Sequence, residues 1–141
     1  MQLLPPKAVL AVAAVIDIAL NARGRPLAAK ALATRHGLSP RHLEPVLHAL
    51  VRHGILKGTR GPRGGYELAR EARRITADDI LRAAGTAVQL DCTPVGNTAL
   101  LKSVVLPVVM QAEEALSAEL TRINVEDLAQ SAGELGRSAA E

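Results

Sequence analysis

Two short stretches of the chain carry side chains that can bind an anion or hydrogen-bond to a polar edge. The stretch SPRHLEPVLH, which begins at Ser39, contains Arg41 and Glu44, and the stretch RGPRGGYEL contains Arg60 and Arg63 among three glycines and a proline. A guanidinium group pairs with phosphate or with guanine, and a carboxylate accepts a hydrogen bond from cytosine. These residue types favour recognition of a polyanion over catalysis.

The first stretch lies on the second of two expected helices. The first helix should cover residues 28–36 and stop at Gly37, and the second should begin with Ser39 as its N-cap and Pro40 at the first helical position. Gly54 closes the second helix. Two helices joined by a short glycine-containing turn form the helix-turn-helix motif.

The second helix has an apolar face made of residues at helical spacing, namely Leu43, Leu47, Leu50 and Val51. The opposite face should point outward, where side chains near the helix N-terminus can reach base edges in a major groove. The candidate contact residues are Ser39, Arg41, His42, Glu44, Pro45 and His48. For the two histidines, an ordinary solvated surface position is the alternative.

The second stretch is flanked by strand-like runs at 55–59 and 66–69, which predict a β-hairpin. A hairpin directly after a helix-turn-helix is a winged helix, and the basic loop is then its wing. Gly61 lets the backbone turn tightly, while Arg60 and Arg63 supply charge to a phosphate or to a narrow minor groove. The alternative is an ordinary exposed hairpin tip.

The remaining elements are also expected to be helical, so the fold class is mainly α with a small β-hairpin. A short helix should begin at Thr76, with Asp79 completing a capping box. The expected division of the chain is a winged helix-turn-helix domain at 1–85, a linker at 86–97, a long helix and a short one at 98–131, and a flexible tail at 132–141.

The long C-terminal helix contains an apolar run at 104–110 that one amphipathic face cannot explain. Pro107 lies inside this run and should bend the helix. A helix that is apolar all round needs cover from outside its own small domain, and a second copy of the chain is the economical cover. The expected dimer interface consists of Leu101, Val104, Val105, Val108 and Val109.

Charge is divided unevenly along the chain. Residues 1–74 hold 13 Lys and Arg against 4 Asp and Glu, whereas residues 75–141 hold 4 against 10, so the two parts carry +9 and −6 and sum to +3. A basic part joined to an acidic part points to a polyanion partner for the first.

Several classes of protein fit the sequence poorly. The apolar N-terminal run is too short to span a membrane and is interrupted by Asp17, which favours a cytoplasmic protein without a membrane partner. No nucleophile–base pairing, phosphate loop or carboxylate pair suggests an enzyme. The four histidines lie at spacings that do not share a helix face, so no metal site is expected.

These stretches together resemble the Rrf-two family of bacterial winged-helix regulators. The matching segments are LSPRHLEPVL, RGPRGGYELAR, ITADDILRA and the closing INVEDL, within residues 7–128. The resemblance implies a homodimer, operator DNA binding, and sensing through the linker before the dimerisation helix. It also implies base contacts at Arg41, His42 and Glu44 and a minor-groove contact at Arg60. Pro45 departs from the family pattern, because it cannot hydrogen-bond to a base.

The linker contains Cys92, the only cysteine of the chain. Cluster-binding members of the family carry three cysteines here, so we expect no iron–sulfur cluster and no other cofactor. A buried hydrophobic role for this thiol and a redox-responsive one both remain open.

The sequence therefore predicts a sequence-specific, homodimeric DNA-binding transcriptional regulator that binds a pseudo-palindromic operator, with repression as the favoured mode. A winged-helix module that binds protein instead of DNA is the alternative. No residue pattern indicates the effector, the operator sequence or the target genes.

Overall fold

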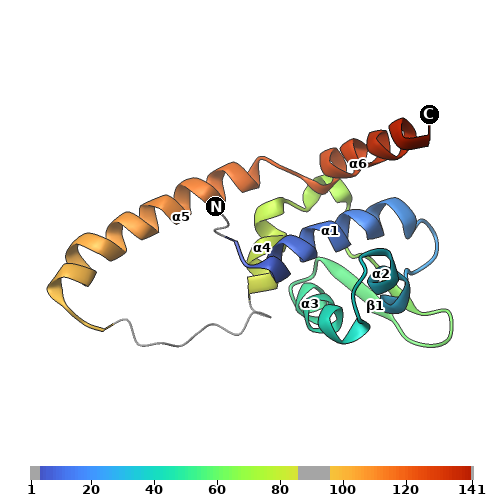
Figure 1. Cartoon of the computed structure of the whole chain (residues 1–141), viewed down its shortest axis with the longest axis horizontal. Helices are drawn as coiled ribbons and strands as arrows, with labels where there is room; N and C mark the ends of the chain where they lie inside the picture. Colours follow the sequence, from blue (N-terminus) through green and yellow to red (C-terminus); the bar gives the residue numbers. More distant parts are fainter. Residues whose placement is uncertain (1–3, 86–95, 141) are drawn as a thin grey trace.

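The computed structural model describes residues 4–85 and 96–140 (Figure 1). The elements follow the expected order, and the chain is mostly helical with one two-stranded antiparallel sheet. They are α1 (Pro6–Asn21), α2 (Ala29–Arg35), α3 (Pro40–Arg52), β1 (Leu56–Thr59), β2 (Gly65–Leu68), the 3₁₀ turn η1 (Ala72–Arg74), α4 (Ala77–Gly85), the π-helical turn η2 (Leu101–Val105), α5 (Leu106–Thr121) and α6 (Val125–Ala140).

Helix α1 lies at the centre of the winged-helix part. It packs against α3 and β2 on one side and against α4 and α6 on the other, while α5 extends away from this body (Figure 1). Small alanines on α1 let the neighbouring helices approach closely, and the core that results is entirely aliphatic. Its largest buried side chains include Val15, Ile18, Leu32, Leu43, Leu47, Leu50, Ile55, Ile80 and Val125.

The helix-turn-helix forms as the sequence predicts. Gly37 ends α2 in the left-handed region, with φ of 66°, and Pro40 begins α3. One detail differs from the prediction. Ser39 occupies the N-cap position, but its side chain makes no capping hydrogen bond to the backbone of α3. Its hydroxyl instead shares a 3.0 Å hydrogen bond with Nδ1 of His42.

The wing is a hairpin whose register pairs Thr59 with Gly65 and Leu56 with Leu68. The loop between α1 and α2 also pairs with this hairpin, because Leu27 and Tyr66 exchange two backbone hydrogen bonds of 2.9 Å. A Cβ atom at Gly65 would lie 2.5 Å from the carbonyl carbon of Leu27, so only glycine allows this close approach.

Helix α4 begins with the expected capping box. The backbone N–H of Asp79 donates to Oγ1 of Thr76, and the backbone N–H of Thr76 donates to Oδ2 of Asp79. The strand-like bridge between Thr76 and Asn124 then ties the start of α4 to the start of α6. Val125 follows and is fully buried, which anchors α6 to the core.

Two features of the C-terminal helices differ from expectation. A π-helical turn, rather than only a bend, precedes Pro107, and its wider winding relieves the clash between the proline ring and the preceding turn. The tail expected from residue 132 onward instead continues α6 as far as Ala140. Helix α6 packs against α1.

Candidate nucleic-acid interface

Helix α3 buries one face and presents the other to solvent, as its spacing predicts. Leu43, Val46, Leu47, Ala49 and Leu50 are buried. The six candidate contact residues are all exposed: Ser39, Arg41, His42, Glu44, Pro45 and His48. They therefore lie on the surface that a helix-turn-helix offers to a groove, and their contacts with DNA stay a prediction.

Two residues shape the outward surface of α3 near its start. The hydrogen bond between Ser39 and His42 fixes the orientation of the imidazole ring beside the helix N-terminus. Pro45 lies inside the helix and lacks the N–H that would bond to the carbonyl of Arg41. Its ring can make an apolar contact, for example with a thymine methyl group.

The tip of the wing is a glycine-supported turn. Gly61 has φ of 110°, and the N–H of Gly64 donates to its carbonyl at 2.9 Å. A Cβ atom at Gly64 would lie 2.1 Å from the carbonyl oxygen of Thr59, so a side chain cannot fit there. The turn leaves Arg60 and Arg63 exposed at the tip.

A groove of about 600 Å³ separates α3 from the wing. Arg60 and Tyr66 line it from the wing, and His48 and Arg52 line it from α3. Arg52 is not among the contact residues predicted from the sequence, although it follows His48 by four residues on the same helix face. Partial burial raises the pKa of Tyr66 above its ordinary value, and the charge of Glu44 raises it further.

A second hollow of about 600 Å³ lies between the wing tip and the loop that joins α1 to α2. It is lined by Arg63 and Pro62 on one side and by Arg25 on the other. Arg25 is likewise absent from the residues predicted from the sequence. The loop that carries Arg25 reaches the wing through the pairing of Leu27 with Tyr66. No local sequence pattern predicts that pairing.

Most arginines elsewhere on the described winged-helix part contact a carboxylate. Arg35 contacts Asp17, Arg70 contacts Asp79, and Arg73 contacts Glu71. Within the part of the chain that the structure describes, the arginines that line the two hollows form no such ion pair, and neither does Arg41 near the start of α3. Those that line the hollows are Arg25, Arg52, Arg60 and Arg63. Their charge is available to an external anion.

The other predicted sites lie apart from this surface. Val104, Val105, Val108 and Val109 are exposed on η2 and α5, and Leu101 is partly buried. Cys92 lies outside the described residues. Among residues 4–85 and 96–140, no three His, Cys, Asp or Glu side chains are grouped as metal ligands would be. No helix in those ranges combines the length and apolar character that crossing a bilayer requires.

The sequence matches a profile of the Rrf2 (Rrf-two) family, described as "Iron-dependent Transcriptional regulator", over residues 4–131. A curated relative from Neisseria meningitidis serogroup A is 38% identical over 89 residues, which cover 63% of this chain and 59% of the relative. The HTH-type transcriptional regulator IscR of Escherichia coli O1:K1 is 33% identical over 78 residues, which cover 55% of this chain and 48% of that protein. The chain thus matches only about half the length of these curated relatives.

Two solved structures share the fold over nearly the whole chain. T. potens IscR superposes with a TM-score of 0.71 and 29% identity, covering 95% of this chain and 90% of its own. CymR, the global cysteine regulator of B. subtilis, superposes with a TM-score of 0.70 and 27% identity, covering 93% and 98%. The chain therefore belongs to the Rrf2 family of winged-helix transcriptional regulators.

Proposed function

We propose that this protein is a sequence-specific regulator that binds double-stranded DNA through α3 and the wing. The observation that carries the proposal is a set of arginines that form no ion pair with a carboxylate within the described residues: Arg41 and Arg52 on α3, Arg60 and Arg63 on the wing, and Arg25 on the α1–α2 loop. Three elements that are separate in sequence present cations around two adjoining hollows. Such a surface suits the phosphate backbone of DNA.

In this proposal, α3 enters the major groove with its N-terminal half. Arg41 donates to the edge of guanine, and Glu44 accepts from the amino group of cytosine. The wing lies alongside, with Arg60 either on a phosphate or inside a narrow minor groove. Arg25 and Arg63 hold the adjacent backbone, because they line the same hollow on the outer side of the wing.

We further propose a homodimer that binds a pseudo-palindromic operator and represses transcription by occupying it. Helix α5 supports the dimer, because no residue on it is buried in the described chain. Val104, Val108 and Met110 are 54%, 62% and 60% exposed. Apolar side chains this exposed on one helix are typical of an interface, and a two-fold axis would place two α3 helices about one turn of DNA apart.

Selection of binders from a randomised duplex pool tests sequence specificity even though the operator is unidentified. We expect an enriched motif with two-fold symmetry. Fluorescence anisotropy on that motif and on a scrambled duplex then compares Arg41→Ala and Glu44→Ala with the wild type. Each should cost about 1–3 kcal/mol on the motif, and Glu44→Ala should bind the scrambled duplex slightly better, because a carboxylate repels phosphate.

An enriched motif and the loss in both variants would support the proposal. Binding to all duplexes alike, or no binding at all, would contradict it. In that case the same exposed surface would serve a protein partner, which is the alternative function of a winged helix.

The residues present do not fit the iron that the family description names. An iron–sulfur cluster takes thiolate ligands, and this chain contains one cysteine in total. The described residues contain no ligand group that would replace the missing thiolates. We propose that DNA binding here needs no metal cofactor. Iron analysis and visible absorption after anaerobic purification test this, and stoichiometric iron with cluster bands would contradict it.

A further inference from the structure

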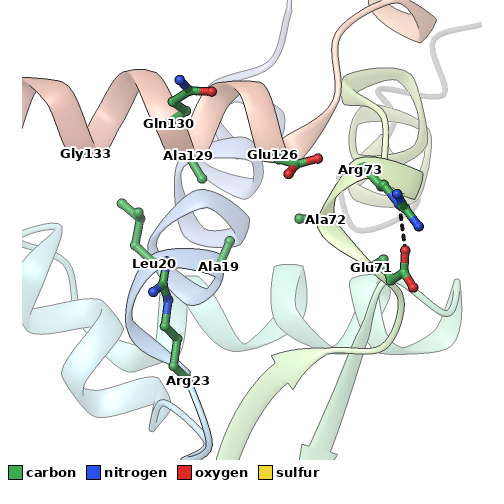
Figure 2. A pocket seen from close by; sticks show the side chains of 10 residues that line it. All are labelled: Ala19, Leu20, Arg23, Glu71, Ala72, Arg73, Glu126, Ala129, Gln130 and Gly133. Atoms are coloured by element: carbon green, nitrogen blue, oxygen red, sulfur yellow. Dashed lines mark hydrogen bonds and ion pairs between the residues drawn. The ribbon is translucent and has the colours of Figure 1, made fainter.

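A cavity of about 580 Å³ lies on the opposite side of α1 from the helix-turn-helix (Figure 2). Three segments line it: the end of α1, the turn η1 and the first half of α6. Its apolar wall is made of small and aliphatic side chains, namely Ala19, Leu20, Ala72 and Ala129. The volume lies within the range of small-molecule sites in proteins.

Two cationic and two anionic side chains line this cavity, and only one cation and one anion among them form an ion pair with each other. Nε of Arg73 donates to Oε2 of Glu71 at 2.7 Å, so these two neutralise each other. Arg23 and Glu126 have no ion pair within the described residues. Figure 2 shows Arg23 beside Leu20 near the end of α1 and Glu126 on α6, with Ala19 between them in this view.

Arg23 and Glu126 thus supply one unpaired cation and one unpaired anion to the lining of the same cavity, and such a pair complements a small zwitterion. We propose that this cavity binds a neutral aliphatic α-amino acid as an effector of DNA binding. The carboxylate of the amino acid binds Arg23, its ammonium group binds Glu126, and its side chain lies against Leu20 and the alanines. The effector role rests on the proposed DNA-binding function, whereas the binding site itself does not.

The segments that line the cavity are connected along the chain to the proposed DNA-binding surface, so a molecule bound in the cavity can affect DNA binding. Arg23 lies in the α1–α2 loop, which also carries Arg25 and pairs through Leu27 with the wing. The turn η1 follows the wing strand β2, and α6 follows α5. An amino acid held between Arg23 and Glu126 would therefore connect the wing to the C-terminal helices.

Calorimetric titration of the full chain without DNA tests the site. Leucine, valine and alanine are compared with their amides, which lack the carboxylate, and with their N-acetyl derivatives, which lack the ammonium group. We expect binding of at least one free amino acid and about tenfold weaker binding of both of its derivatives. Failure of every free amino acid to bind, or equal binding of the derivatives, would overturn the site.

Variants identify the two charged groups. Arg23→Gln and Glu126→Gln should each weaken binding of the amino acid by about tenfold or more. Asp127→Asn is the matched control for Glu126→Gln, because both carboxylates lie in the first turn of α6 and only Glu126 lines the cavity. Unchanged binding in both cavity variants would overturn the assignment.

Anisotropy on DNA with and without the amino acid tests the effector role. Saturation should change DNA affinity by about fivefold or more, as for other coupled sites, and the change should vanish in Glu126→Gln. Binding of the amino acid without any change in DNA affinity would overturn the effector role. If the protein bound no DNA either with or without the amino acid, the proposed DNA-binding function would fail instead, and calorimetry would still test the binding site.

Discussion

Nε of Arg35 in α2 donates a 2.8 Å hydrogen bond to Oδ2 of Asp17 in α1. The Asp17 side chain is only 8% exposed, and it is the one charged residue among the buried ones of the described chain. Asn21 donates to its other oxygen at 2.6 Å, and Nε2 of His36 lies 3.3 Å from Oδ2. This carboxylate therefore fastens the first helix of the helix-turn-helix to the central helix.

Replacing this carboxylate should weaken the whole fold. Asp17→Ala removes the carboxylate that accepts hydrogen bonds from Arg35 and Asn21, and we expect the free energy of unfolding to fall by about 1–3 kcal/mol. Urea denaturation followed by circular dichroism measures this. Glu134→Ala, on α6, should change it by less than about 0.5 kcal/mol. Equal stability of the two variants would contradict the role of Asp17.

Tyr66 reports on the contact between the wing and α3. It is the only aromatic residue of the chain, so tyrosinate absorbance follows this one phenol. Burial first, and then the charge of Glu44, raise its pKa above the ordinary value of 10.0. Because the folded state favours the neutral phenol, the stability that this preference contributes is present below the unfolded pKa and is lost as the pH rises through the folded pKa.

We expect the titration midpoint of Tyr66, which reports its pKa, to lie above 10.0. Glu44→Gln should lower the midpoint but leave it raised, since the burial of the phenol remains. Glu67→Gln is the matched control, because this carboxylate adjoins Tyr66 in sequence and is not among the causes of the raised pKa. An unchanged midpoint in Glu44→Gln would show that α3 and the wing do not approach each other as described.

Much of the fold could be predicted because short sequence patterns indicate its helices and turns. The spacing of leucines marks α3, the pair Thr76 and Asp79 marks the start of α4, and the glycines mark the turn of the wing. Asp17 stands out in the sequence only as an interruption of an apolar run. Its main partner Arg35 lies 18 residues away on another helix, so no local pattern could reveal the pair.

Local sequence patterns also predict part of the candidate interface. The exposed residues of α3 follow from helical spacing, whereas Arg25 reaches the wing only through tertiary pairing of the backbone. The length of α6 was not predicted because residues 132–140 are rich in alanine, glycine and serine. Such a segment has no strong apolar pattern of its own from which a helix could be predicted.

The proposed dimer predicts a specific effect of charge on α5. Val108→Asp should convert a dimer into a monomer at micromolar concentration, because an unpaired carboxylate buried in an apolar interface costs several kcal/mol. Light scattering measures the mass. Leu135→Asp is the control, since Leu135 is a similarly exposed apolar residue on α6. A monomeric wild type, or a dimeric Val108→Asp variant, would contradict the assignment of this interface.

The last prediction separates two kinds of contact made by the arginines near the wing. If Arg25 and Arg63 each bind one phosphate, replacement by Ala should weaken binding to all duplexes alike and reduce the slope of log K against log salt by about 0.9 per half-site. Arg122→Ala is the control, because Arg122 contacts Glu119 at the C-terminal end of α5 and lines neither hollow beside the wing.

Arg60 lies at the inner side of the wing, facing the groove beside α3, and should behave differently from these two. If it enters a narrow minor groove, the loss in Arg60→Ala should be greatest on duplexes with A·T-rich flanks, where the negative potential is strongest. If it binds a phosphate, the loss should be independent of the flanks and accompany the same change in salt slope. Anisotropy at several salt concentrations on flank-matched duplexes distinguishes the two. An Arg60→Ala variant that binds every duplex like the wild type would remove this residue from the interface.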